Sequence, residues 1–291
     1  MTNIVRFRRG EDEPAIGIHQ AGLVIPLPGV RELAKLWAMP RDELRYRLAE
    51  PDHAAALPLD EVQLLAPVDG RTEVWACGVT YQTSREARIE ESEADADLYA
   101  RVYDAERPEL FFKSVAWRVS GPLRPVGIRA DSAANVPEPE LALVVNRHGE
   151  TVGYTICNDM SSRSIEGENP LYLPQAKIYA GACGLGPWIT PAWEIPDPYR
   201  LGITLTIDRD GSRCWEGQTG TSQLNRRFDD LVAYLMRGGM HPDGVVLATG
   251  TCLVPPPPFT LAAGDVVTIM IEGIGALTNP VVRGQIPEDT A

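Results

Sequence analysis

Alternating or continuous apolar segments, bounded by glycine, proline and polar turns, predict strands along most of the chain beyond residue 70. Residues 202–208 alternate clearly and residues 141–146 form an apolar run typical of a buried strand; residues 73–79, 110–113, 151–157, 244–251 and 265–272 also have strand character. A helical period is confined to residues 29–48, 84–104 and 221–237. Strands outnumber helices and do not alternate with them, so the pattern predicts a β-rich α+β fold rather than a parallel sheet.

Residues 1–64 differ in character from the rest of the chain. Two short alternating segments, residues 4–7 and 17–20, precede the helical stretch 29–48, which Pro40 should divide into two helices. Proline-containing residues 57–67 mark a boundary. We therefore predict a small N-terminal α+β domain over residues 1–64, with a role in packing or dimerisation, and a main domain over residues 65–291.

The predicted helix over residues 84–104 opens with the capping pattern Thr83-x-x-Glu86. Its apolar stripe is thin, so the helix would be weakly anchored to the rest of the fold. A lid over a binding site and a solvated surface helix explain this pattern equally well.

Composition excludes several classes of partner. A net charge of −13 and a pI near 4.8 argue against binding to nucleic acid or to an anionic membrane. No stretch approaches the ~20 apolar residues of a membrane span, and the first residues lack the apolar segment of a signal peptide. The five cysteines form no CxxC pair, which is typical of a reducing compartment. We expect a cytoplasmic protein.

Three carboxylates fall into register across a predicted hairpin. Glu138 and Glu140 should lie side by side, because residues i and i+2 of a strand share a face. A two-residue turn at His148-Gly149 would place Asp159 directly opposite Glu138. Taken singly, each carboxylate is better explained as a solvated charge. Together they predict an all-oxygen cation site, which suits Mg²⁺, Mn²⁺ or Ca²⁺ better than Zn²⁺.

The order and spacing of four segments resemble the fumarylacetoacetate hydrolase superfamily. They are Pro137–Val145, Gly153–Asp159, Ser161–Arg163 and Lys177–Pro187, and the resemblance extends from about residue 65 to 285. The run from Glu168 to Gly181 is similar to the branch that contains 2-keto-3-deoxy-D-arabinonate dehydratase. The resemblance implies a mixed β-sandwich roll for the main domain, assembled into a homodimer or homotetramer.

The resemblance also implies a reaction on a small 2-oxo sugar acid. In this family the divalent cation binds the substrate's C1 carboxylate and C2 carbonyl and stabilises the enolate formed when a C3 proton leaves. In the dehydratase branch the C4 hydroxyl then departs. A 2-keto-3-deoxy-pentonate would become 2,5-dioxopentanoate and water, as a step of pentose breakdown.

Further site residues follow from the same resemblance. Lys177 matches the family's lysine near the metal-bound oxygens and is the expected proton-transfer group. Thr251, after Gly250, matches the residues that hold the substrate carboxylate. The remaining candidates are Tyr81 and Arg163 beside the substrate and Glu168 or Glu86 as an acid–base carboxylate, although the sequence does not separate these glutamates from solvated ones.

One departure from the wider family bears on the reaction type. Hydrolases of the superfamily carry a histidine and a glutamate shortly after the strand that corresponds to residues 73–79, and this pair activates water. Residues 80–87 contain no histidine. Dyad-driven hydrolysis is therefore disfavoured, whereas a dehydratase does not need this pair. An acylpyruvate-type hydrolase, a decarboxylase or an isomerase on the same scaffold is the alternative to dehydration. A catalytically silent β-rich binding protein is the alternative from another class.

Overall fold

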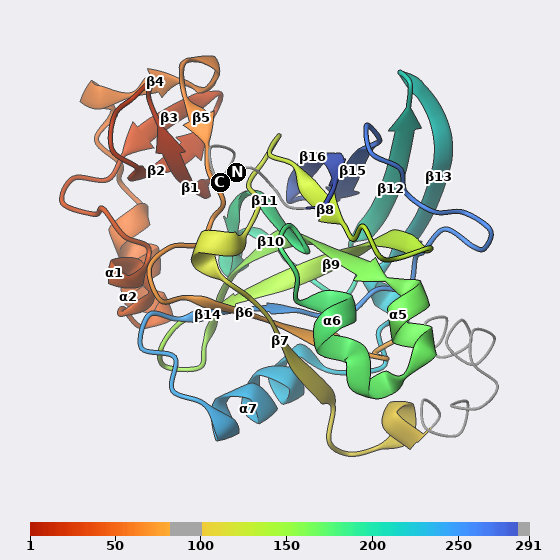
Figure 1. The fold of residues 1–291 in the computed structure, drawn as a ribbon. Helices are drawn as coiled ribbons and strands as arrows, with labels where there is room; N and C mark the ends of the chain where they lie inside the picture. The colour runs from red at the N-terminus through yellow and green to blue at the C-terminus, as the bar shows by residue number, and fades with distance from the viewer. Residues whose placement is uncertain (82–100, 285–291) are drawn as a thin grey trace.

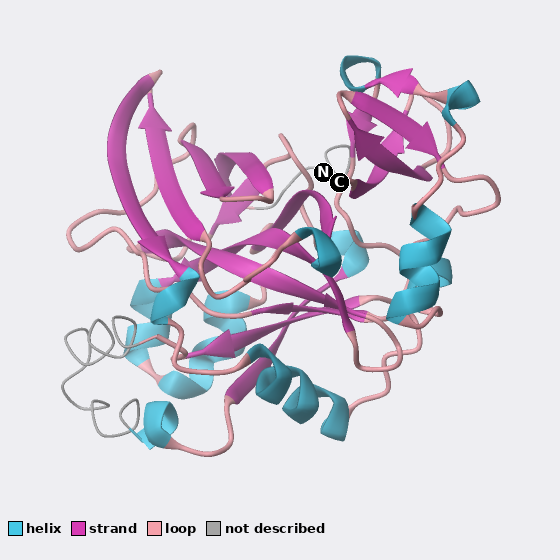
Figure 2. Cartoon of the chain, turned by 180° about the vertical axis from the view of Figure 1, so that it is seen from behind, coloured by secondary structure: helices cyan, strands magenta, loops and turns pink. Residues whose placement is uncertain are grey.

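Two β-sheets form the centre of the protein in the computed structural model, which describes residues 1–81 and 101–284 (Figure 1). Seen from behind, the strands cross the middle of the molecule and the helices lie around them (Figure 2). The β-rich α+β class predicted from the alternating pattern is confirmed. Of the predicted lid helix, residues 84–100 lie outside the described residues, and residues 101–104 are helical.

The larger sheet contains strands from both the N-terminal and the C-terminal parts of the chain. Within the described residues it has eleven strands in the order β4-β3-β2-β1-β11-β10-β9-β14-β6-β7, with β5 paired to β1. Only the β14–β6 pair is parallel among these neighbours. The strands are β1 (Asn3–Arg8), β2 (Ala15–Gln20), β3 (Leu23–Pro26), β4 (Leu57–Pro58), β5 (Gln63–Leu64), β6 (Glu73–Gly78), β7 (Glu109–Val115), β9 (Asn135–Val145), β10 (Thr151–Ser162), β11 (Cys183–Pro191) and β14 (Val245–Ala248).

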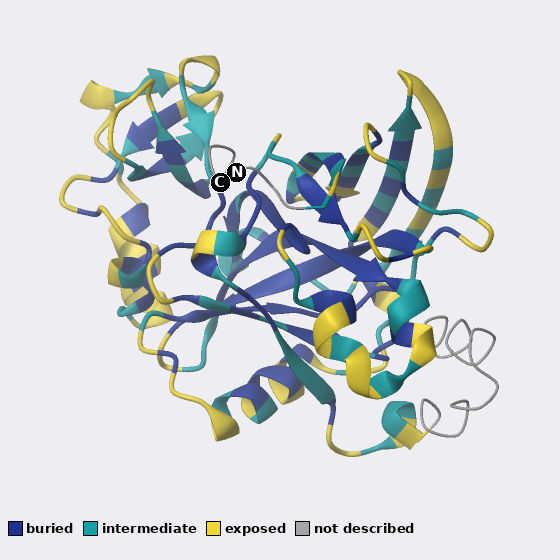
Figure 3. Cartoon of the chain, viewed as in Figure 1, coloured by how far each residue is buried: buried dark blue, intermediate teal, exposed yellow. Residues whose placement is uncertain are grey.

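Strands β9 and β10 are buried on both faces (Figure 3). Leu141 and Leu143 pack into one hydrophobic cluster, whereas Ala142 and Val144 pack into another on the opposite face. This explains why residues 141–145 form a continuous apolar run instead of alternating with polar residues. The hairpin therefore runs through the middle of the fold, and the packed core on both of its faces fixes the positions of its side chains.

The turn of this hairpin differs from the prediction. Asn146 pairs with Glu150 through its backbone N–H, and the Asn146 side-chain oxygen accepts the N–H groups of His148 and Glu150. These local bonds close a three-residue loop, so the two-residue turn was wrong. A bulge at Val152 then restores the register, because the pairing shifts by one residue between Thr151 and Gly153. Asp159 consequently still pairs with Glu138, as predicted.

The smaller sheet has five strands among the described residues, in the order β13-β12-β15-β16-β8. One face packs onto the cluster that contains Leu141, through residues such as Leu205, Ile269 and Leu277. Strand β13 is an exposed edge (Figure 3). The strands are β8 (Val126–Ile128), β12 (Gly202–Arg209), β13 (Ser212–Gly220), β15 (Val266–Ile271) and β16 (Gly275–Arg283).

Helix α7 (Phe228–Gly238) is shorter than predicted. Phe228, Leu231, Val232 and Leu235 form its buried face, as the helical period indicated. Residues 221–227 do not join it, because tertiary contacts hold them in place. Thr221 exchanges hydrogen bonds with Leu201, and Leu224 forms a β-bridge with Tyr81, which follows β6.

The N-terminal residues are continuous with the rest of the larger sheet. Ile4 of β1 pairs with Ile189 of β11, and their side chains share one hydrophobic cluster. The predicted break at Pro40 is confirmed, since α1 (Ala34–Trp37) ends before it and α2 (Arg41–Leu48) follows it. A separate domain over residues 1–64 stays a prediction.

Candidate active site

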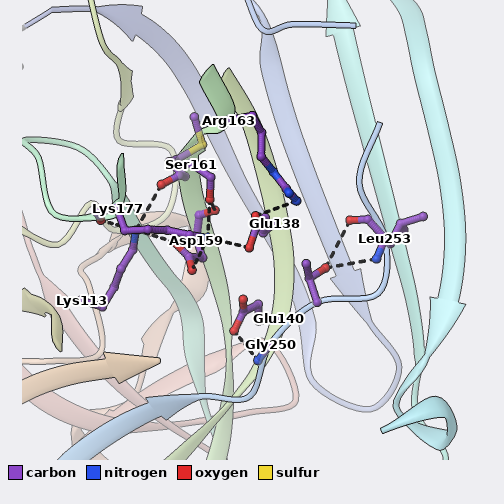
Figure 4. Close-up of polar contacts among 11 residues, drawn as sticks. Lys113, Glu138, Glu140, Asp159, Ser161, Arg163, Lys177, Gly250 and Leu253 are labelled. Atoms are coloured by element: carbon purple, nitrogen blue, oxygen red, sulfur yellow. Dashed lines mark hydrogen bonds and ion pairs between the residues drawn. The ribbon is translucent and has the colours of Figure 1, made fainter. Parts of the chain in front are cut away.

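Glu138, Glu140 and Asp159 lie together at one end of the β9–β10 hairpin. One carboxylate oxygen of each lies within 4.8 Å of those of the other two. All three side chains are buried, although each carries a carboxylate. The register predicted from the sequence therefore does bring the three groups to one place (Figure 4).

Each carboxylate is held through one of its oxygens by a different donor. Arg163 Nη2 lies 3.0 Å from Glu138 Oε1, and the backbone N–H of Gly250 donates to Glu140 Oε2 at 2.7 Å. Asp159 Oδ1 forms an ion pair with Lys113, which is fully buried. Three separate segments of the chain thus orient the three groups, as outer partners commonly orient metal ligands.

Lys177 contacts the other oxygen of two of these carboxylates. Its Nζ atom lies 2.7 Å from Glu138 Oε2, 3.1 Å from Asp159 Oδ2 and 2.5 Å from Ser161 Oγ. The lysine is the last residue of α6 (Leu173–Lys177), which follows α5 (Arg163–Glu168) over the end of the hairpin (Figure 1). The structure therefore brings together Lys177 and the three carboxylates, as the sequence predicted.

The electrostatics of the cluster favour a bound cation. Burial raises the pKa of the Glu140 carboxyl well above its ordinary value, and the charges of Asp159 and Glu138 raise it further. Lys177 and the Gly250 N–H oppose this shift in pKa. Three hard oxygen donors converge within a buried site, which is the donor set that Mg²⁺ and similar ions take. The residues present fit a divalent cation.

A cavity of about 260 Å³ opens beside this cluster. Phe111, Pro170 and Leu173 form part of its apolar wall. Its charged wall, among the described residues, consists of Glu109, Glu138, Asp159, Arg163, Glu166 and Lys177.

The placement of the predicted acid–base glutamate is informative. Glu168 is exposed and does not line the cavity, whereas Glu166 is buried and does. Arg163 and Glu166 are three residues apart on α5, so they share a helix face that Glu168 does not join. This spacing is the signal that could have selected Glu166 from the sequence. Glu86, the other candidate, lies outside the described residues.

The predicted substrate-binding residues divide into two groups. Gly250, Thr251 and Arg163 line the cavity, and Gly250 has a φ of +91° that favours glycine. A Cβ atom there would also collide with Thr80. Tyr81, in contrast, is fully buried and is not among the described residues that line the cavity.

The cavity lining also bears on hydrolysis and covalent catalysis. None of the four histidines, all of which fall within the described ranges, lines the cavity. Cys77 does line it, but burial raises the pKa of this thiol well above its ordinary value. A protonated thiol is a poor nucleophile. The described wall therefore offers metal and acid–base chemistry in preference to a water-activating dyad or a cysteine nucleophile.

Comparison with known proteins agrees with this geometry. The family model for the fumarylacetoacetate (FAA) hydrolase C-terminal region matches residues 75–282. The chain belongs to the FAA hydrolase family. The resemblance seen in the sequence motifs is thereby confirmed, and the matched range contains every one of the candidate site residues described above.

Relatives within the FAA hydrolase family include two named dehydratases. A Haloferax volcanii protein named "Probable 2-keto-3-deoxyxylonate dehydratase" is 47% identical over 253 residues, covering 86% of this chain and 86% of that protein. The 2-dehydro-3-deoxy-D-arabinonate dehydratase of Saccharolobus solfataricus is 43% identical over 228 residues, covering 77% of this chain and 76% of that protein.

A solved structure extends the comparison to the whole fold. It is described as 2-keto-3-deoxy-D-arabinonate dehydratase complexed with magnesium and 2,5-dioxopentanoate. It matches with a TM-score of 0.84 and 34% sequence identity, over 98% of this chain and 100% of that one. In the described part of the present chain, no helix is both long and apolar enough to cross a membrane.

Proposed function

We propose that this protein is a hydro-lyase that removes water from a 2-keto-3-deoxy-pentonate, with Mg²⁺ as cofactor, to give 2,5-dioxopentanoate. The observation that carries the proposal is the buried cluster of Glu138, Glu140 and Asp159 with Lys177 against it. Two relatives that match this chain over most of their length are named dehydratases.

The two relatives' names are compatible with a single substrate. In a 2-keto-3-deoxy acid, C2 is a carbonyl and C3 a methylene, so neither carbon is a stereocentre. Arabinonate and xylonate of the same series differ only at these two carbons. Their 2-keto-3-deoxy derivatives are therefore one compound, and the names in the two relatives support one substrate for this chain.

Charge balance in the site suits an anionic 2-oxo acid. With a divalent cation bound, Glu138, Glu140 and Asp159 would all be ionised, and their three negative charges would be matched by Lys113, Lys177 and Arg163. When bound by the three carboxylates, a divalent cation supplies Lewis-acid polarisation of the 2-oxo group. The cluster would then carry a surplus of positive charge, which favours the substrate carboxylate and the negative charge that develops as C3 loses a proton.

We assign the proton transfers of the reaction to three side chains that line the cavity. Lys177 is the group we assign to the proton at C3, because its Nζ atom lies against the cation ligands and in the cavity wall. Glu166 and Glu109 also line the cavity and are not in the carboxylate cluster. We assign to this pair the proton given to the departing C4 hydroxyl and the proton taken from C5.

We assign binding of the substrate's carboxylate to the part of the cavity wall formed by Gly250 and Thr251. Thr251 and Gly250 line the cavity next to Glu140, and the Thr251 hydroxyl is fixed by hydrogen bonds with Leu253. Arg163 is given a different role from the one predicted, since it pairs with Glu138 and orients that ligand. A cytoplasmic location and a homodimer or homotetramer stay predictions.

A panel of substrates tests this function against the alternatives. The purified protein is incubated with 2-keto-3-deoxy-pentonates, longer 2-keto-3-deoxy-aldonates and acetylpyruvate, each with Mg²⁺ and with EDTA. We expect dehydration of a pentonate that stops in EDTA. Faster turnover of acetylpyruvate would instead favour a hydrolase, and a protein that binds no metal would favour the silent binding protein.

A further inference from the structure

Lys113 is buried beneath the carboxylate cluster and is not among the described residues that line the cavity. Its Nζ atom pairs with Asp159 Oδ1, donates to the carbonyl oxygen of Met160 at 3.1 Å and donates to that of Lys177 at 2.5 Å. An ammonium has three N–H donors, so these three acceptors use all of them. From β7, Lys113 thus reaches two residues of β10 and the last residue of α6 (Figure 4).

The backbone at Lys113 is irregular in a way that aims this side chain. On β7, Ser114 pairs with Val74 and Phe112 pairs with Trp75, the next residue of β6. Lys113 is therefore the extra residue of a β-bulge. Bulges redirect a side chain and are frequent beside active sites. The inserted residue is the one whose side chain reaches Asp159 and the Lys177 carbonyl.

The use of lysine in this chain provides independent support. The sequence has three lysines and 24 arginines, so arginine is the usual basic residue. Two of the three lysines, Lys113 and Lys177, are buried at this one cluster, whereas Lys35 lies at the surface. A compact ammonium satisfies three acceptors grouped around one point, which a planar guanidinium does not.

We propose that Lys113 is a positioning residue for the metal site: it holds Asp159 as a one-oxygen ligand and fixes the backbone that carries Lys177. Asp159 has Oδ1 committed to Lys113, and its other oxygen, Oδ2, lies 3.1 Å from Lys177 Nζ. The contact with the Lys177 carbonyl sets where α6 ends relative to that oxygen. This inference rests on the metal site of the proposed function.

The test compares Lys113→Met with a matched control. Methionine keeps the length and burial of the side chain but removes its charge and its three hydrogen bonds. The control is Arg209→Met, which breaks the pair between Arg209 and the fully buried Asp265, away from the cavity. Magnesium binding to each folded protein is measured by titration calorimetry, and folding by circular dichroism and thermal unfolding.

We expect Lys113→Met to weaken Mg²⁺ binding about 10- to 100-fold, the usual effect of losing an outer partner of a metal ligand. Its kcat should stay low at saturating Mg²⁺, because Lys177 is displaced as well. Arg209→Met should lower the unfolding temperature and leave Mg²⁺ affinity unchanged. Lys113→Arg keeps the charge beside Asp159 but not the geometry, so it should also bind Mg²⁺ more weakly. This variant carries the test if Lys113→Met does not fold.

Mg²⁺ affinity and kcat equal to wild type in the folded Lys113 variants, with only thermal stability reduced, would overturn the proposal and make Lys113 structural. The wild-type protein is measured first. Wild-type Mg²⁺ binding without formation of 2,5-dioxopentanoate would refute the proposed function while leaving the role of Lys113 to be decided by metal affinity alone.

Discussion

Glu138 and Asp159 are direct cross-strand partners in β9 and β10, and the Lys177 ammonium contacts a carboxylate oxygen of both. The pairing register of one hairpin thus decides whether the site exists. A slip of one residue would turn Asp159 to the opposite face of the sheet. The buried apolar residues on both faces of β9 oppose such a slip, because it would move Leu141 and Leu143 out of their cluster.

Loss of any one carboxylate should abolish the metal-dependent reaction. In Glu138→Gln, Glu140→Gln and Asp159→Asn, an oxygen ligand is replaced by a weaker amide donor and the charge available to a cation falls by one. We expect near-complete loss of turnover and weaker Mg²⁺ binding, with the fold retained by circular dichroism. Persistence of both turnover and Mg²⁺ dependence in two of the three variants would show that the assignment is wrong.

Lys177→Ala should separate proton transfer from metal binding. We expect kcat to fall by about 10²-fold or more, the usual scale for an acid–base group. Mg²⁺ affinity should not fall, because the ammonium shares Glu138 and Asp159 with the metal instead of acting as a ligand. Steady-state kinetics and calorimetry on one preparation give both values. A variant with wild-type kcat and lower stability would reduce Lys177 to a structural role.

Glu166 and Glu168 form a matched pair for the second acid–base group. They lie two residues apart on the same helix, but only Glu166 is buried in the cavity wall. Glu166→Gln should lower kcat by about 10²-fold or more, whereas Glu168→Gln should behave as wild type. The same assay under saturating Mg²⁺ compares them. The opposite ranking would restore the glutamate first chosen from the sequence.

The carboxylate cluster was predictable because it depends on local rules. Strand periodicity places Glu138 and Glu140 on one face, and a short connection fixes which residue of β10 lies opposite. The turn itself was predicted wrongly, since Asn146 closes a longer loop through its side chain. The bulge at Val152 cancels that error, so the register at Asp159 was nevertheless correct.

The surroundings of the cluster were not predictable, because they come from distant segments. Lys113 reaches Asp159 from β7, and nothing in the short apolar run that ends at Lys113 indicates the bulge. Arg163 of α5 lines the cavity, but its ion pair with Glu138 of β9 could not be predicted from the sequence. Tyr81 follows a strand that does reach the cavity, but its ring turns into the core. Such outcomes depend on packing between elements rather than on periodicity within one.

The hairpin turn should show a defined pH dependence through Glu150. Hydrogen bonds from the Asn146 side chain and the Arg41 backbone N–H lower the pKa of this carboxyl below its ordinary value. Since the folded pKa is below the unfolded one, the stabilisation is present above the unfolded pKa of about 4.3 and is lost as pH falls through the folded value.

Glu150→Ala therefore should lower the unfolding temperature at about pH 7 and do so less at a pH below the folded pKa of Glu150, where the wild-type carboxyl is protonated and its charge is lost. Thermal unfolding of both proteins at the two pH values measures this difference. A decrease in unfolding temperature of the same size at both pH values would show that the charge of Glu150 does not stabilise the turn.

Mass spectrometry of the product formed from a 2-keto-3-deoxy-pentonate in D₂O with Mg²⁺ tests the central claim most directly. The account predicts a five-carbon dicarbonyl acid, lighter than the substrate by one water apart from incorporated deuterium. Deuterium should enter where the transient enols are reprotonated, and no product should form in EDTA. Failure to lose water from this substrate, together with cleavage of an acylpyruvate into pyruvate and a shorter acid, would contradict it.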